Sequence, residues 1–239
     1  RSLRSRAGVG LTANVVQHSS LRISSVAVNS PALILLRHGT KTLVAGARQW
    51  SVADGGVVVV AGDQTLDIEN RLSGEGLFEA RWVVWDPSLF AQAELLVQGP
   101  RELRDVAVLK AAPVGFRCAV DRAVAAICEE AAVPQKVAAH RLIELLLWLS
   151  EFGIKLTAGR QTSTSSKLRG IISATPARTW TVAAAADHVA TSEATLRRRL
   201  VAEGTSFNAV LADVRMSLAM TLLQSTERSS TGNGSERTE

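Results

Sequence analysis

Hydrophobic and polar residues in the first third of the chain alternate in the manner of short strands. Apolar stretches recur between residues 14 and 86, among them Ala32–Leu36, Gly56–Ala61 and Leu77–Trp85. Clusters of Gly, Asn, Asp, Ser and Pro separate these stretches at intervals of about 8–12 residues, which is typical of turns between strands. The spacing predicts a small β-barrel or β-sandwich over the residues up to 86.

After residue 86 the apolar positions change to helical spacing. Helices are predicted over 88–97, 116–132 and 136–152, which makes the segment 87–156 helical. The third helix is apolar around so much of its circumference that it is either deeply buried or half of a contact between two copies of the chain. The residues predicted for such a dimer contact are Val137, Leu142, Leu145, Leu146 and Leu149.

Polar runs then predict the domain limits. An N-terminal domain over 1–156 is followed by a polar linker over 157–166 and by a helical domain over 167–226. The last stretch, 227–239, contains no apolar residue and is predicted to be disordered.

Within the helical domain, the pattern predicts two short helices joined by a tight polar turn. The first, over 181–190, has a narrow apolar stripe of small residues. Ser192 is a suitable N-cap for the second helix, 193–203, which buries Leu196 and Leu200. Two such helices have the geometry of a helix-turn-helix.

Three consecutive arginines, 197–199, remain on the exposed side of the second predicted helix. A guanidinium offers parallel donors that match the O6 and N7 atoms of guanine, or a phosphate. Because successive residues on a helix diverge by about 100°, Arg197 and Arg198 can face a groove together with Ala194, while Arg199 turns to the flank. Taken alone, such a run is most often a solvated helix face.

The wider pattern from Trp180 to Thr226 resembles the DNA-binding domain of the AraC/XylS family of transcription regulators. The residues that carry the resemblance are Trp180, Ala185, Ser192, Leu196, Arg198, Gly204, Thr205, Ser206, Phe207, Leu211, Arg215, Met216, Ala219, Leu222 and Leu223. The resemblance implies that Ala194, Arg197 and Arg198 meet base edges in a major groove. It places Ser192 and Thr195 near the sugar-phosphate backbone.

The same resemblance implies an α+β chain with a cupin-like N-terminal barrel or sandwich and an all-α helix-turn-helix domain. In that family the N-terminal domain commonly senses an effector, here either a small molecule or a partner protein, and forms a homodimer. The implied partners are double-stranded DNA and RNA polymerase, in a cytoplasmic activator with no cofactor and no membrane contact.

One departure from the family pattern concerns the end of the chain. The family has two helix-turn-helix units joined by a long helix, and 206–223 matches the joining helix. Its second apolar strip, Met216, Ala219, Met220 and Leu223, is followed by the polar tail in place of a second unit. We therefore expect a truncated or frame-shifted form with weakened DNA binding. The alternative is a product without specific DNA binding that acts only through its N-terminal domain, by binding a ligand or trapping subunits.

Composition and charge change this picture little. The chain has 239 residues, of which 46% are hydrophobic and 21% charged, so wholesale disorder is excluded. Aromatic residues make up only 4%, and the core must be aliphatic. The net charge of +5 is spread almost evenly along the chain and points to no particular binding domain.

Motifs for enzyme chemistry are absent from the sequence. The histidines, His18, His38, His140 and His188, stand singly, and no pair has the spacing of metal ligands. Neither a nucleophile elbow nor a phosphate-binding glycine loop occurs. Cys118 and Cys128 are interpreted as reduced core or near-core thiols. The sequence therefore predicts no catalytic site and no metal site.

The lining of the predicted barrel bears on the kind of effector. Trp82 and Trp85 lie three apart in a strand and must point to opposite faces, so at most one of them lines the interior. An interior lined by Leu33, Leu35, Val58, Val60 and Trp82 would favour an apolar ligand.

Overall fold

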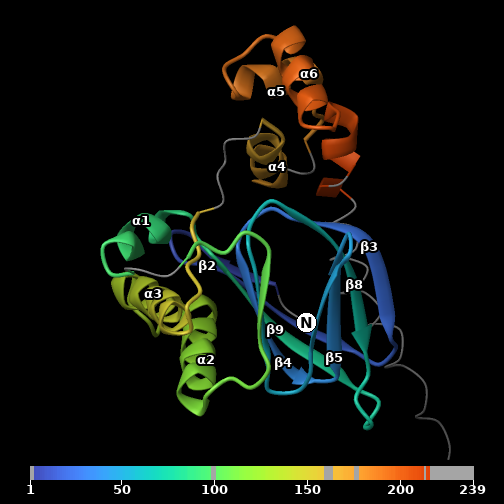
Figure 1. Ribbon diagram of the computed structural model, residues 1–239. Coiled ribbons are helices and arrows are strands. Elements are labelled where there is room, and N and C mark those ends of the chain that lie inside the picture. The colour runs from blue at the N-terminus through green and yellow to red at the C-terminus, as the bar shows by residue number, and fades with distance from the viewer. Residues whose placement is uncertain (1–2, 98–100, 159–163, 175–177, 213, 216–239) are drawn as a thin grey trace, which may run out of the picture. The chain divides into compact units, whose positions relative to one another are not determined.

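The computed structural model describes the chain except for residues 1–2, 98–100, 159–163, 175–177, 213 and 216–239 (Figure 1). It divides into two compact units, an N-terminal unit over Arg1–Arg160 and a C-terminal unit over Gln161–Glu239. The polar tail 227–239 and the second apolar strip of the joining helix lie outside the described residues.

The N-terminal unit contains two antiparallel sheets that enclose a common interior (Figure 1). The six-stranded sheet has the order β1 (Arg4–Arg6), β2 (Gly10–Gln17), β9 (Phe78–Trp85), β4 (Ala32–His38), β7 (Val57–Val60) and β10 (Val106–Leu109). The four-stranded sheet has the order β3 (Leu21–Val28), β8 (Gln64–Arg71), β5 (Thr40–Ala45) and β6 (Arg48–Val52). The predicted β-rich N-terminal part of an α+β fold is thereby confirmed.

Alternation along the strands separates two hydrophobic cores. On β9, Trp82 faces the interior between the sheets, whereas Trp85 faces the other side of the six-stranded sheet, where the helices pack. The predicted opposite orientation of the two tryptophans is confirmed. The predicted interior lining holds for Val58 and Val60 but is wrong for Leu33 and Leu35, which pack against the helices. A run that is buried on both faces carries no alternation from which its facing can be derived.

Three helices cover the outer face of the six-stranded sheet (Figure 1). They are α1 (Ser88–Glu94), α2 (Val114–Cys128) and α3 (Gln135–Glu151). The indole nitrogen of Trp85 donates a hydrogen bond of 2.9 Å to the carbonyl oxygen of Leu142, which ties α3 to the sheet. Gly153, with a φ of +74°, follows the end of α3 in the left-handed conformation that glycine adopts most easily.

Burial corrects the predicted dimer contact on α3. Leu142, Leu145 and Leu149 are fully buried within the unit, and Leu146 is 4% exposed. Side chains that pack against the unit's own core cannot meet a second chain. Among the predicted contact residues only Val137, at 42% exposure, offers a surface.

Three further expectations need correction. The segment predicted to be helical up to 156 contains β10, which pairs with β7 and so extends the sheet. Helix α4 (Thr164–Ala174) begins inside the predicted linker. Both cysteines are exposed rather than buried.

The C-terminal unit is helical over its described residues. After α4 come α5 (Val182–His188), α6 (Glu193–Ala202) and helical residues 207–212 and 214–215. Their small core consists of Leu168, Ile172, Trp180, Ala185, Ala186, Leu196, Leu200, Phe207, Val210 and Val214. Among the described residues of both units, no helix combines the length and the apolar character that a membrane crossing requires.

Candidate nucleic-acid interface

Helices α5 and α6 form the predicted helix-turn-helix, and each begins at a capping hydroxyl. The Thr181 hydroxyl accepts a hydrogen bond of 3.1 Å from the backbone N–H of Ala184. Ser192 accepts one of 3.3 Å from the backbone N–H of Thr195. Each cap satisfies one of the free N–H groups at its helix start. The predicted cap at Ser192 is confirmed, whereas Thr181, predicted as the first residue of its helix, is the cap of α5.

The turn between the two helices forces Ala190 into the left-handed region, with a φ of +51°. A side chain at this φ costs roughly 1 kcal/mol, which glycine avoids. Replacement of Ala190 by glycine should therefore raise the free energy of unfolding of the C-terminal unit by about 0.5–1 kcal/mol. The greater freedom of glycine in the unfolded chain reduces this gain somewhat. Thermal unfolding followed by helical circular dichroism tests this prediction, and a lower melting temperature for the variant would contradict it.

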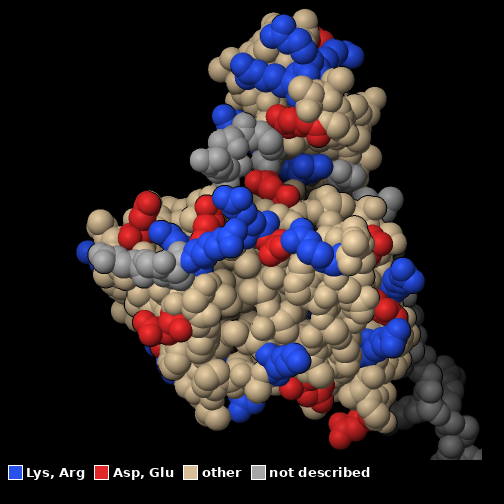
Figure 2. Space-filling view, in the orientation of Figure 1, with Lys and Arg blue, Asp and Glu red and all other residues tan. Residues whose placement is uncertain are grey.

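Helix α6 turns one side to the core and the other to solvent. Leu196 and Leu200 are completely buried. On the opposite side, Ala194, Arg197, Arg198 and Val201 are exposed and span an arc of about 100°. We call these four residues the outward strip of α6. Figure 2 shows basic side chains gathered on the C-terminal unit.

The arginines of α6 remain available for an external partner. Arg197 has an acidic neighbour one turn away, Glu193, at 3.7 Å, but both side chains are at least half exposed. Such an i,i+4 pair contributes only about 0.3–0.5 kcal/mol and exchanges readily for a phosphate or base. Arg198 and Arg199 are exposed as well. The predicted orientation of Arg197 and Arg198 away from the core is confirmed.

Ser192 and Thr195 are linked to each other at the start of α6. Besides the cap, the Ser192 hydroxyl donates a hydrogen bond of 2.9 Å to the Thr195 hydroxyl. Both lie at the N-terminal end of the helix, where the helix dipole favours a negative group such as a phosphate. Their placement is compatible with the expected contact to the sugar-phosphate backbone.

Glu203, just after α6, connects this helix to α4. Its carboxylate accepts hydrogen bonds from the backbone N–H groups of Thr164, at 2.6 Å, and Ser165, at 2.8 Å. Burial alone would raise the pKa of Glu203, but hydrogen bonds from Ser165 and Thr164 outweigh it and hold the pKa below its ordinary value. Glu203 thus caps α4 as an anion and fixes it against the end of α6.

The N-terminal unit contains a buried lysine, Lys41. This side chain is 1% exposed and lies between the sheets. Its Nζ donates a hydrogen bond of 2.8 Å to Asn70 and sits 5.7 Å and 5.2 Å from the ring centroids of Phe78 and Trp82. Desolvation by burial lowers the pKa of Lys41 to about 7. Alternation within Thr40–Ala45 could have revealed this residue, since Lys41 shares the face of Leu43.

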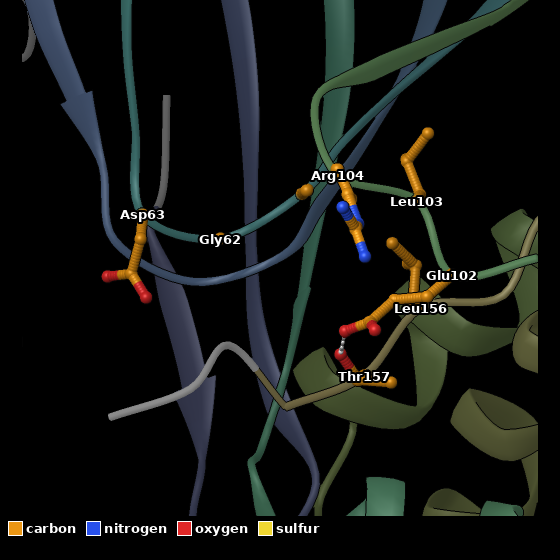
Figure 3. A pocket seen from close by; sticks show the side chains of 8 residues that line it. Gly62, Asp63, Glu102, Leu103, Arg104, Leu156 and Thr157 are labelled. Carbon is orange, nitrogen blue, oxygen red and sulfur yellow. Dashed lines mark hydrogen bonds between the residues drawn. The ribbon is translucent and has the colours of Figure 1, made fainter. Parts of the chain in front are cut away.

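A polar hollow of about 400 Å³ lies in the same unit (Figure 3). Its lining comes from the β7–β8 turn with Asp63, from the segment before β10 with Glu102 and Arg104, and from Leu156 and Thr157. The Thr157 hydroxyl donates a hydrogen bond of 2.6 Å to Glu102. Because these residues are far apart in the sequence, the pattern of hydrophobic and polar positions does not indicate that they meet. No cluster of three or more potential metal ligands occurs among the residues that the structure describes.

Comparison of sequences relates one segment of the chain to bacterial transcription regulators. Over 59 residues, which is 25% of this chain and 22% of each relative, it is 46% identical to the HTH-type transcriptional activator CsvR of Escherichia coli. Over the same length it is 44% identical to the HTH-type transcriptional activator CfaD and to the DNA-binding dual transcriptional regulator Rns, both of Escherichia coli. The chain thus matches about a fifth of the length of these relatives. No family model matches the chain.

Comparison of structures extends over most of the chain. A crystal structure of an apo ToxT variant from Vibrio cholerae superimposes with a TM-score of 0.63 at 11% identity, covering 92% of this chain and 84% of that one. Wild-type ToxT with a bound unsaturated fatty acid gives a TM-score of 0.60 at 10% identity, covering 90% and 82%. At these identities the likeness establishes the fold, a cupin-like barrel with helices followed by a helix-turn-helix domain.

Proposed function

We propose that this protein binds double-stranded DNA and regulates transcription, because 59 of its residues are 44–46% identical to bacterial transcription regulators and its C-terminal unit contains a helix-turn-helix. Helix α6 enters the major groove with its outward strip. Arg197 and Arg198 contact base edges there, while Ser192 and Thr195 approach the backbone of the duplex.

The observation that carries this proposal is the two-sided character of α6. Leu196 and Leu200 anchor one side in the core, and Arg198 is exposed on the other side. A guanidinium held on a rigid helix can reach the O6 and N7 atoms of guanine with two parallel hydrogen bonds. The 44–46% identity over 59 residues to two HTH-type transcriptional activators and one DNA-binding regulator supports the same role.

Replacement of Arg198 by alanine should weaken binding to the preferred duplex by about 1–3 kcal/mol and relax the preference at one base pair. The measurement is fluorescence anisotropy at fixed salt, with the full chain and duplexes selected by it from a random library. Equal affinity of wild type and variant for the selected duplex would refute the role of Arg198.

The matched control is Arg199→Ala, which removes the same charge from the same helix but from its flank. Its loss should be equal for selected and random duplexes, because a phosphate contact carries no sequence information. The two variants together separate base recognition from general electrostatic attraction.

We further propose that the N-terminal unit adds regulation, by binding an effector and by joining two copies into a homodimer, in a cytoplasmic activator that works with RNA polymerase. The hollow around Glu102 and Arg104 has a volume in the range of small-molecule sites. Its lining residues Leu156 and Thr157 come shortly before the segment that leads into the C-terminal unit. An effector there would contact the chain close to this connection.

A further inference from the structure

The outward strip of α6 contains an apolar member besides its arginines. Val201 is 72% exposed, more than most other large hydrophobic side chains among the described residues. A single exposed valine is ordinary on a protein surface. This one, however, lies one turn after Arg197 and Arg198, on the side of the helix opposite Leu196 and Leu200.

From this position Val201 can reach the same surface of the duplex as Arg197 and Arg198. Along the helix axis, one turn advances by about 5.4 Å. Successive base pairs are about 3.4 Å apart, so a side chain one turn away from Arg198 faces a base pair one or two steps further along. Ala194, one turn on the other side, ends at its Cβ and reaches less far.

The chemistry of the major groove then identifies the partner of this side chain. Of the four bases only thymine places a methyl group, on C5, in the major groove, and aliphatic side chains recognise it by apolar contact. A valine one turn after two arginines therefore suits a thymine that neighbours a guanine. Opposite the other bases, the valine side chain would leave hydrogen-bond donors or acceptors in the groove without a partner.

We propose that Val201 is a specificity-determining residue that contacts the 5-methyl group of a thymine one or two base pairs from the guanine bound by Arg198. This inference rests on the proposed function, since it requires α6 to lie in a major groove. It adds a sequence preference that the arginines alone do not create.

The experiment starts from duplexes that the chain of 239 residues enriches from a random library. The position at which the Arg198→Ala variant no longer prefers guanine identifies the base pair that Arg198 contacts. The thymine expected within two base pairs of it is then replaced by deoxyuridine, which removes only the 5-methyl group. Wild type should lose about fourfold in affinity, the effect of one buried methyl group. Val201→Ala should bind thymine and deoxyuridine duplexes equally.

The matched control is Val114→Ala, the same change at a valine of the N-terminal unit that is 65% exposed, which should keep the full discrimination. If wild type enriches no sequence, the proposed function fails and this inference with it. If a motif is enriched but Val201→Ala still discriminates fourfold, or no thymine stands within two base pairs of the guanine, only the inference is overturned.

Discussion

Replacement of Lys41 by methionine is expected to stabilise the N-terminal unit, most strongly below about pH 7. The folded protein must there keep an ammonium group in the apolar interior, where Asn70 and the rings of Phe78 and Trp82 replace water only in part. The lowering of the Lys41 pKa from 10.5 to about 7 corresponds to a cost of the order of 5 kcal/mol. Loss of the bond to Asn70 offsets about 1–3 kcal/mol of the gain. Methionine should therefore stabilise by a few kcal/mol.

The pH course of this effect has a definite sign. In the unfolded chain Lys41 keeps its proton up to about pH 10.5, whereas in the folded unit it releases the proton near pH 7. Between these values the unfolded state binds more protons, so the wild-type contribution to stability rises with pH. Methionine does not titrate. The advantage of the variant is thus complete below pH 7 and disappears towards pH 10.5.

Urea unfolding followed by tryptophan fluorescence at pH 6 and pH 9.5 measures the difference. Lys110→Met, the same replacement at an exposed lysine, serves as the control and should change stability by less than about 0.5 kcal/mol at either pH. A Lys41→Met advantage of equal size at both pH values would contradict the assigned cause, and so would a loss of stability at pH 6.

Replacement of Leu200 by alanine is expected to unfold the helix-turn-helix. Leu200 is fully buried in the core of the C-terminal unit, which contains only ten buried hydrophobic residues among those described. A buried Leu→Ala change costs about 2–5 kcal/mol. Such a loss is comparable to the whole stability of a small domain, typically about 5 kcal/mol or more. The outward strip would then lose the rigid support that positions its arginines.

The neighbouring residue provides the control for this prediction. Val201→Ala removes aliphatic carbon from the same helix, but at 72% exposure it should leave stability within about 0.5 kcal/mol. Hydrogen exchange at the amides of α5 and α6 reports the unfolding directly. Loss of protection in Leu200→Ala, with the sheets of the N-terminal unit still protected, is the expected result. Equal protection in both variants would show that α6 does not depend on this core.

The sequence predicted local structure well where one signal decided it. Ser192 marks a helix start because a hydroxyl cap competes for local N–H groups, and Trp82 and Trp85 separate because a strand has a period of two. It failed where apolar residues follow one another with few polar residues between them. In the dense leucines of α3 and the run from Ala32 to Leu36, the pattern does not indicate which element each side chain packs against.

The candidate interface shows the same division. Arg197 and Arg198 were predicted to point outward, because Leu196 and Leu200 define the buried side of α6. Lys41 and Val201 are not found from the sequence, because Lys41 is a charged residue in the interior and Val201 is an aliphatic residue on the surface. Both depart from the usual distribution of polar and apolar residues.

Periodicity, capping residues and a spaced motif were enough to establish a β-rich first part, a helix-turn-helix and its outward arginines. These features depend on contacts within a few turns or strands, which neighbouring residues encode. The packing of three helices on one face of the sheet, the burial of the α3 leucines and the hollow around Glu102 and Thr157 emerged only from the folded chain. They join segments far apart in sequence, and such contacts depend on how complete surfaces fit together.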